Sequence, residues 1–106
     1  MINIEDLRKI NCVERIALTE HGRIRLIERG ITIDDVVLCI ENGEIIEQYE
    51  DDKPFPSCLV LGMTVKNRYI HVVVSRDEEF IYLITAYIPS REKFEDDLKT
   101  RKERKK

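Results

Sequence analysis

The sequence predicts an α+β fold in which N-terminal helices pack on a four-stranded antiparallel sheet and a short C-terminal helix follows. Helix-capping residues and a helical hydrophobic period occupy residues 3–43. Strand-forming residues separated by short turns occupy residues 44–88. Because 106 residues suffice for one ordinary domain, we expect a single α+β domain over residues 1–98 and a basic C-terminal tail over residues 99–106.

Each of the three predicted N-terminal helices begins at a side chain that can accept a hydrogen bond from the first turn. Asn3 is placed to cap a short first helix. Thr19 is placed to cap a second helix, and Gly30 ends it because glycine readily takes a positive φ angle. Thr32 and Asp35 form a capping pattern for a third helix. This helix carries apolar residues at i, i+3, i+4 and i+7, which are Ile33, Val36, Val37 and Ile40.

Four strands are expected in the second half of the chain, at residues 44–50, 57–65, 68–75 and 80–88. Lys66 and Asn67 are expected to form a two-residue hairpin loop, since asparagine tolerates a positive φ angle. Consecutive strands joined by short turns usually pair antiparallel. After Pro89 and Ser90, a charged C-terminal helix is expected that carries Phe94 and Leu98.

Composition favours a folded cytoplasmic domain, with 42% hydrophobic and 37% charged residues. The longest apolar runs have four or five residues, far fewer than a membrane span requires, and no apolar leader opens the chain. Cys12, Cys39 and Cys58 stand apart, as is typical of reduced thiols. With two histidines and no paired cysteines, the sequence gives no zinc-site spacing.

Charge is distributed unevenly along the chain. Residues 99–106 contain six basic residues and one acidic residue, a net charge of +5, which leaves −8 for residues 1–98 within the total of −3. An acidic body repels phosphate at long range, so any nucleic-acid binding must depend on local basic groups. The tail is consistent with a solvated terminus, with self-association through the acidic surface of a partner, or with a weak phosphate contact.

A polar stripe on the second helix is the first candidate for function. His21, Arg25 and Arg29 recur every four residues and span about 80° of the helix surface. The two arginines repel each other at this spacing, so an anion or a carboxylate beside them would be favourable. A solvated helix face and an anion-binding site are both consistent with this pattern.

His71 and Tyr87 are the other candidates, and both lie in predicted strands. Strand alternation places His71 on the face opposite Ile70 and Val72. Tyr87 lies near the end of the last strand, where a phenol can be half-buried. A satisfied sheet histidine and a rim aromatic remain the structural alternatives to a catalytic pair.

The sequence has neither a glycine-rich phosphate loop nor a nucleophile elbow. What remains is a set of histidine, arginine and tyrosine side chains that suits RNA cleavage without a metal ion. In that reaction an imidazole takes the proton of the 2′-hydroxyl, arginines hold the phosphate, and a second imidazole or a phenol protonates the leaving oxygen.

Four segments of the sequence carry a family resemblance, and they are residues 18–36, 40–62, 71–74 and 84–89. Together they resemble the bacterial and archaeal family called domain of unknown function 4258. This resemblance implies a toxin of a toxin–antitoxin pair, similar to RelE-like, BrnT-like and MqsR-like toxins. It implies a zinc-finger antitoxin of the MqsA/YgiT type as partner. His21, Arg25, Arg29, His71 and Tyr87 match the polar positions of the family pattern.

We therefore expect a toxin-like, metal-independent endoribonuclease that acts on RNA and needs no cofactor. The alternative is a non-catalytic small binding module that docks a protein partner. The acidic body departs from the basic character typical of RelE-like toxins. A nuclease requires His71, Tyr87 and at least one of Arg25 and Arg29 to face one cleft.

Overall fold

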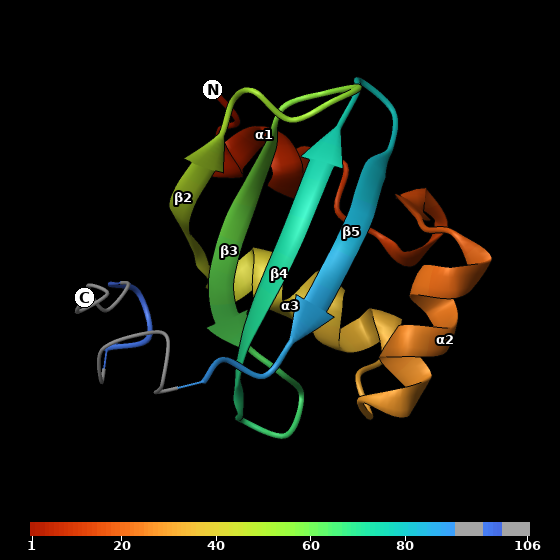
Figure 1. Ribbon diagram of the computed structural model, residues 1–106, viewed down its shortest axis with the longest axis vertical. Coiled ribbons are helices and arrows are strands. Elements are labelled where there is room, and N and C mark those ends of the chain that lie inside the picture. Colours follow the sequence, from red (N-terminus) through yellow and green to blue (C-terminus); the bar gives the residue numbers. More distant parts are fainter. Residues whose placement is uncertain (91–96, 101–106) are drawn as a thin grey trace, which may run out of the picture.

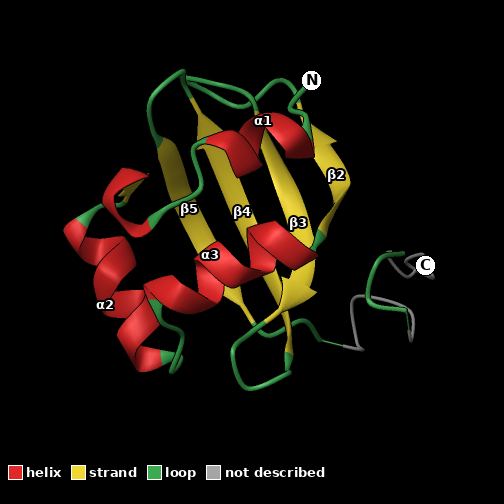
Figure 2. Cartoon of the chain, turned by 180° about the vertical axis from the view of Figure 1, so that it is seen from behind, coloured by secondary structure: helices red, strands yellow, loops and turns green. Residues whose placement is uncertain are grey.

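The computed structural model describes residues 1–90 and 97–100, and in them helices pack against one mixed β-sheet (Figures 1 and 2). The helices are α1 (Ile4–Lys9), α2 (Glu20–Glu28) and α3 (Ile33–Asn42), with a 3₁₀ turn at Val13–Arg15. The strands are β1 (Ile16–Ala17), β2 (Glu44–Tyr49), β3 (Ser57–Met63), β4 (Tyr69–Arg76) and β5 (Ile81–Tyr87). The predicted α+β class is confirmed.

Within the described residues the sheet has five strands in the order β1-β5-β4-β3-β2, one more than predicted. The four predicted strands pair antiparallel with their neighbours, as expected. The prediction of a purely antiparallel four-stranded sheet was wrong, because β1 adds to β5 in parallel through Ile16 and Ala17. A strand of two residues is too short to show alternation, and its partner lies far along the chain.

The predicted C-terminal helix falls largely on residues 91–96, which lie outside the described residues. Residues 97–100 form turns rather than a helix, and Leu98 has a positive φ angle of 59°. The remainder of the predicted basic tail, residues 101–106, also lies outside the described residues.

The predicted helix caps are confirmed. Side chains of Asn3 and Thr19 accept hydrogen bonds from the first turns of α1 and α2. Thr32 and Asp35 form the full capping box of α3, with backbone N–H groups donating to Asp35 Oδ2 at 2.9 Å and to Thr32 Oγ1 at 3.1 Å. Gly30 follows α2 with a φ angle of 68°, which is strained for residues with a side chain.

Residues 64–68 connect β3 and β4, and the hairpin loop inside the Thr64–Arg68 pair has three residues, not two. Thr64 N donates to Arg68 O at 2.8 Å and closes a loop of residues 65–67. Asn67 takes the positive φ angle of 61° that the sequence predicted for it. A third loop residue is the usual arrangement when a single left-handed residue ends a hairpin turn.

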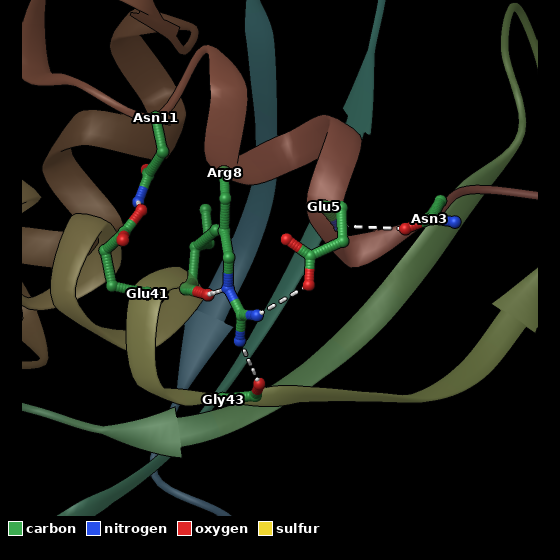
Figure 3. A network of polar contacts seen from close by, with 7 residues as sticks. Asn3, Glu5, Arg8, Asn11, Glu41 and Gly43 are labelled. Atoms are coloured by element: carbon green, nitrogen blue, oxygen red, sulfur yellow. Dashed lines mark hydrogen bonds and ion pairs between the residues drawn. The ribbon is translucent and has the colours of Figure 1, made fainter.

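The main core lies between one sheet face and the helices, which cover that face in Figure 2. α3 packs closely on β3, where a Cβ atom on Gly62 would lie 2.5 Å from Cys39 O. Arg8 ties α1 to the end of α3, because its guanidinium donates to Ile40 O at 3.1 Å and to Gly43 O at 2.9 Å (Figure 3). A cation at a helix C-terminus also stabilises the helix dipole.

A second, smaller cluster covers part of the opposite sheet face. Its buried residues are Leu59, Leu61 and Leu98, and Ile46, Tyr49 and Val73 pack against them. Leu98 comes from the described C-terminal segment, so residues 97–100 lie on the sheet face that the helices leave open. A salt bridge from Lys99 Nζ to Glu44 Oε2 at 3.2 Å adds to this attachment.

Candidate functional site

The polar stripe of α2 lines a cavity of about 260 Å³ between this helix and β5. Its lining residues are Thr19, His21, Gly22, Arg25, Leu26, Leu83, Ile84, Thr85 and Ala86. None of these lining residues is an aspartate or a glutamate. The cavity therefore combines an arginine, an imidazole and two hydroxyl groups inside a domain whose net charge is negative. Such a site favours an anion by local charge.

α2 is exposed around most of its circumference. His21 and Arg25 are exposed, and Ile24 and Ile27 are 45% and 66% exposed as well. Only Leu26 of this helix is buried. A surface helix normally turns its apolar residues to the core. The two isoleucines therefore leave apolar area on the solvent side of α2, away from His21 and Arg25.

Arg29 continues the polar stripe and fixes the end of α2 to β5. Its Nη1 group donates to Ala86 O at 2.8 Å and to Thr85 Oγ1 at 3.2 Å. Because β1 pairs with β5 only at Ile81 and Tyr82, no described strand flanks β5 beyond that point on this side. Arg29 thus donates a hydrogen bond to a carbonyl on an unpaired strand edge. Without such a donor, an unpaired edge can pair with a strand of another chain.

His71 and Tyr87 lie directly opposite each other in the β4–β5 register. Their rings meet edge to face, with centroids 5.4 Å apart and an interplanar angle of 69°. The His71 side chain is fully buried, and its Nε2 lies 2.8 Å from Leu98 O. Since a carbonyl oxygen only accepts, Nε2 carries the ring proton in this contact.

The five predicted residues therefore form two groups. His21 and Arg25 line the cavity and Arg29 anchors its wall, whereas His71 and Tyr87 pair elsewhere in the sheet and do not line it. β5 connects the groups, because Ala86, the acceptor for Arg29, precedes Tyr87 in the chain. The structure confirms that His71 and Tyr87 lie on neighbouring strands, but it does not place all five side chains around one cleft.

Sequence reasoning missed the two hydroxyl-bearing side chains of the cavity. Thr19 was identified only as a helix cap, yet it also lines the cavity. Thr85 contributes to the wall and to the attachment of Arg29. A signal for Thr85 was present, because it stands beside Ala86 and Tyr87 in one of the four resembling segments.

Two cysteines that the sequence suggested to be reduced are unpaired and buried in the core. Burial raises the pKa of the Cys39 thiol and of the Cys58 thiol to about 12 in each case. Within residues 1–90 and 97–100, no three His, Cys, Asp or Glu side chains gather as metal ligands do. In that same part of the chain, none of the helices has the length and apolar character for crossing a bilayer.

A family model described as "Domain of unknown function (DUF4258)" matches residues 18–88, or 71 of the 106 residues. The chain belongs to this family. The matched DUF4258 segment begins just before α2, ends just after β5 and includes all five candidate residues. No curated protein and no solved structure matches the chain. The likeness to RelE-like, BrnT-like and MqsR-like toxins stays a prediction.

Proposed function

We propose that this DUF4258 chain is the toxin-like component of a toxin–antitoxin pair and cleaves RNA without a metal ion. The observation that carries the proposal is the carboxylate-free cavity lined by His21 and Arg25. The domain as a whole is acidic, but an arginine and an imidazole lie together around this cavity. The isoleucines of the same helix lie on its outer side. The cavity therefore offers a local site for a phosphate group.

The proposed reaction is an internal transesterification. His21 takes the proton of the 2′-hydroxyl, and the 2′-oxygen attacks the adjacent phosphorus. The bond from phosphorus to the 5′-oxygen then breaks and leaves a 2′,3′-cyclic phosphate and a 5′-hydroxyl product. Arg25 stabilises the negative charge that develops on the phosphate oxygens. Histidine suits the role of base because its unperturbed pKa lies close to neutrality.

The other three residues support this chemistry in different ways. Arg29 holds the end of β5 against α2 and so positions the wall of the cavity. Tyr87 does not line the cavity, and its ring packs edge-on against the fully buried His71. The leaving 5′-oxygen is therefore proposed to take its proton from a water molecule, while His71 and Tyr87 are proposed to hold the end of β5 in place.

The partner that we propose is a zinc-finger antitoxin of the MqsA/YgiT type. The family resemblance of the sequence suggests such a partner, and the exposed side chains of Ile24 and Ile27 on the outer side of α2 offer apolar area for a protein contact. A partner that binds α2 there and extends over the cavity would block RNA. Co-expression of a zinc-finger protein of the MqsA/YgiT type is expected to relieve growth arrest caused by the wild-type chain.

The decisive experiment compares two substrates in the presence of a chelator. We expect the wild-type chain to cleave a single-stranded RNA, and to leave intact the same oligonucleotide with 2′-deoxy sugars, which lack the nucleophile. The products should end in cyclic phosphate. His21→Ala should slow cleavage by about 10²–10⁴-fold, as for loss of a general base. Equal cleavage of both substrates, or cleavage that stops with chelator, would contradict the mechanism.

A second candidate function is a non-catalytic binding module that docks a protein partner. It is favoured by the same exposed isoleucines and by the complete burial of His71. The two functions differ in one outcome. A binding module captures its partner through α2 and produces neither growth arrest nor RNA cleavage, and His21→Ala then changes neither.

A further inference from the structure

A second cavity, of about 560 Å³, lies on the other side of β5 from the His21–Arg25 cavity. It is lined by Asp52, Lys53, Pro54, Phe55, Ser75, Tyr82 and Ile84. Ile84 lines both cavities, so the two are neighbours across a single strand. This position is the bulge of β5, where the register with β4 shifts between Val73 and Val74.

Two aromatic rings form one wall of the second cavity. Phe55 and Tyr82 lie nearly parallel, with an interplanar angle of 13° and centroids 6.2 Å apart. The Phe55 side chain is 46% exposed and that of Ile84 is 50% exposed. An exposed aromatic ring beside an aliphatic side chain is the usual platform for a planar ligand, because each ring presents a flat apolar face.

The platform is held in place by hydrogen bonds from the strands. Tyr82 OH donates to Asp77 Oδ2, and Asp77 Oδ1 accepts from two backbone N–H groups at 2.7 and 2.8 Å. The loop that carries Phe55 is attached to β4 by Ser75 Oγ, which donates to Pro56 O at 2.8 Å. These contacts fix the Tyr82 hydroxyl and the backbone next to Phe55, which lowers the entropic cost of stacking.

We propose that this second cavity, between Phe55, Tyr82 and Ile84, binds an unpaired base of single-stranded RNA by stacking. The inference rests on the proposed nuclease function, because it assigns the phosphate of the same RNA to the neighbouring His21–Arg25 cavity. A nucleotide joins a charged phosphate to a flat apolar base. The His21–Arg25 cavity suits the phosphate, and the adjacent cavity beside Phe55 and Tyr82 suits the base. Asp52 and Lys53 both line this cavity, so their charges offset each other and recognition rests on the apolar surfaces of the rings and Ile84.

The test uses the fact that the chain contains no tryptophan. In the full-length Phe55→Trp variant, the single indole emission reports on the platform. Addition of a short single-stranded RNA with 2′-O-methyl sugars, which resists cleavage, is expected to quench this emission. The same oligonucleotide with an abasic site at the stacked position should bind without quenching. Unchanged emission with bound RNA would overturn the proposal.

Affinity measurements on Phe55 variants provide the second arm. Phe55→Ala should weaken binding of the oligonucleotide by about tenfold, the typical effect of losing one stacked base. Phe55→Leu should bind as weakly as Phe55→Ala, whereas Phe55→Tyr should bind like the wild type, because only the latter keeps a ring. If Phe55→Ala binds RNA as well as the wild type, the cavity serves another ligand, such as a protein side chain, and the proposal is wrong.

The outcomes separate this inference from the nuclease proposal. If RNA binding depends on Phe55 but no RNA is cleaved, the base site is supported and the nuclease function is contradicted. If RNA is cleaved and Phe55→Ala leaves the KM unchanged, the nuclease function is supported and the base site is contradicted. Circular dichroism of each variant shows whether the fold is intact, and the exposed position of Phe55 predicts that it is.

Discussion

The imidazole of His71 and the backbone carbonyl of Leu98 are 2.8 Å apart, although 27 residues separate them in the sequence. This hydrogen bond attaches residues 97–100 to the sheet face that the helices leave open. The Leu98 side chain is 8% exposed and packs with Leu59 and Leu61. One contact therefore fixes both the C-terminal segment and the ring of a candidate functional residue.

The first prediction concerns the contribution of Leu98 to stability. Leu98→Ala removes buried methyl groups from the smaller cluster and should lower the free energy of unfolding by about 2 kcal/mol. Lys99→Ala is the matched control, because an exposed salt bridge contributes at most about 1 kcal/mol. Urea unfolding followed by circular dichroism measures both. Equal effects of the two substitutions would show that the Leu98 packing contributes little.

The same substitution should also change access to His71. In the wild type the ring is buried, so diethyl pyrocarbonate should modify the exposed His21 and spare His71. Leu98→Ala is expected to make His71 reactive under native conditions. Mass spectrometry of the modified peptides distinguishes the two histidines. A His71 that reacts equally fast in the wild type would contradict the burial described here.

Much of the fold was predictable because its signals are local. The caps at Asn3, Thr19 and Thr32 depend on side chains within three residues of the groups that they bind. The four antiparallel strands follow from alternation and short turns. β1 was not predicted, since two residues carry no period and the parallel partner is Ile81. The pairing of a short strand with a partner far along the chain cannot be predicted from local sequence.

The candidate site was only partly predictable for the same reason. The helical period grouped His21, Arg25 and Arg29 correctly on one stripe, but no local signal showed that this stripe faces β5. The burial of His71 depends on Leu98, which local periodicity cannot place. Placing these side chains required the tertiary structure, which brings α2 against an open strand edge and residues 97–100 onto the opposite sheet face.

A second prediction concerns the cysteines. Burial raises the pKa of the Cys39 and Cys58 thiols from 9.0 to about 12, so both stay protonated in the folded chain. A thiol reagent at pH 8 should label only Cys12, which is partly exposed. Labelling of all three at the rate of the unfolded chain would show that the core opens readily. Mass spectrometry of the native and urea-unfolded protein gives the comparison.

The same pKa shifts predict a lower free energy of unfolding at alkaline pH. A group whose pKa is raised by folding contributes stability that is fully present below pH 9.0, and this stability is lost as the pH rises towards about 12. Unfolding free energies should therefore fall across this window. Cys58→Ala removes one of the two thiols and should reduce the size of the fall. An identical fall in the variant would assign the loss to other groups.

Asp77 provides the corresponding prediction for acid. Hydrogen bonds from Tyr82 OH, and then from the Phe80 and Glu79 backbone N–H groups, lower the pKa of this carboxyl below 3.8. The stability that it contributes is present above pH 3.8 and is lost as the pH falls through the lowered pKa. Asp77→Asn should make the stability curve shallower in this range. Tyr82→Phe, which keeps the backbone donors, should have a smaller effect, and a larger effect would contradict the assignment.

The most direct test of the central claim compares two arginines two residues apart on α2, which lie on different sides of the helix. Arg25 lines the cavity, whereas Arg23 does not line it and pairs with Glu20 at 2.6 Å. Both substitutions to alanine remove one positive charge, so general attraction of RNA falls equally. With chelator present, we predict that Arg25→Ala lowers the RNA cleavage rate by about 10²-fold or more, while Arg23→Ala leaves it within about threefold of the wild type. Equal rates for the two variants, or no cleavage by the wild type, would contradict a phosphate site between α2 and β5.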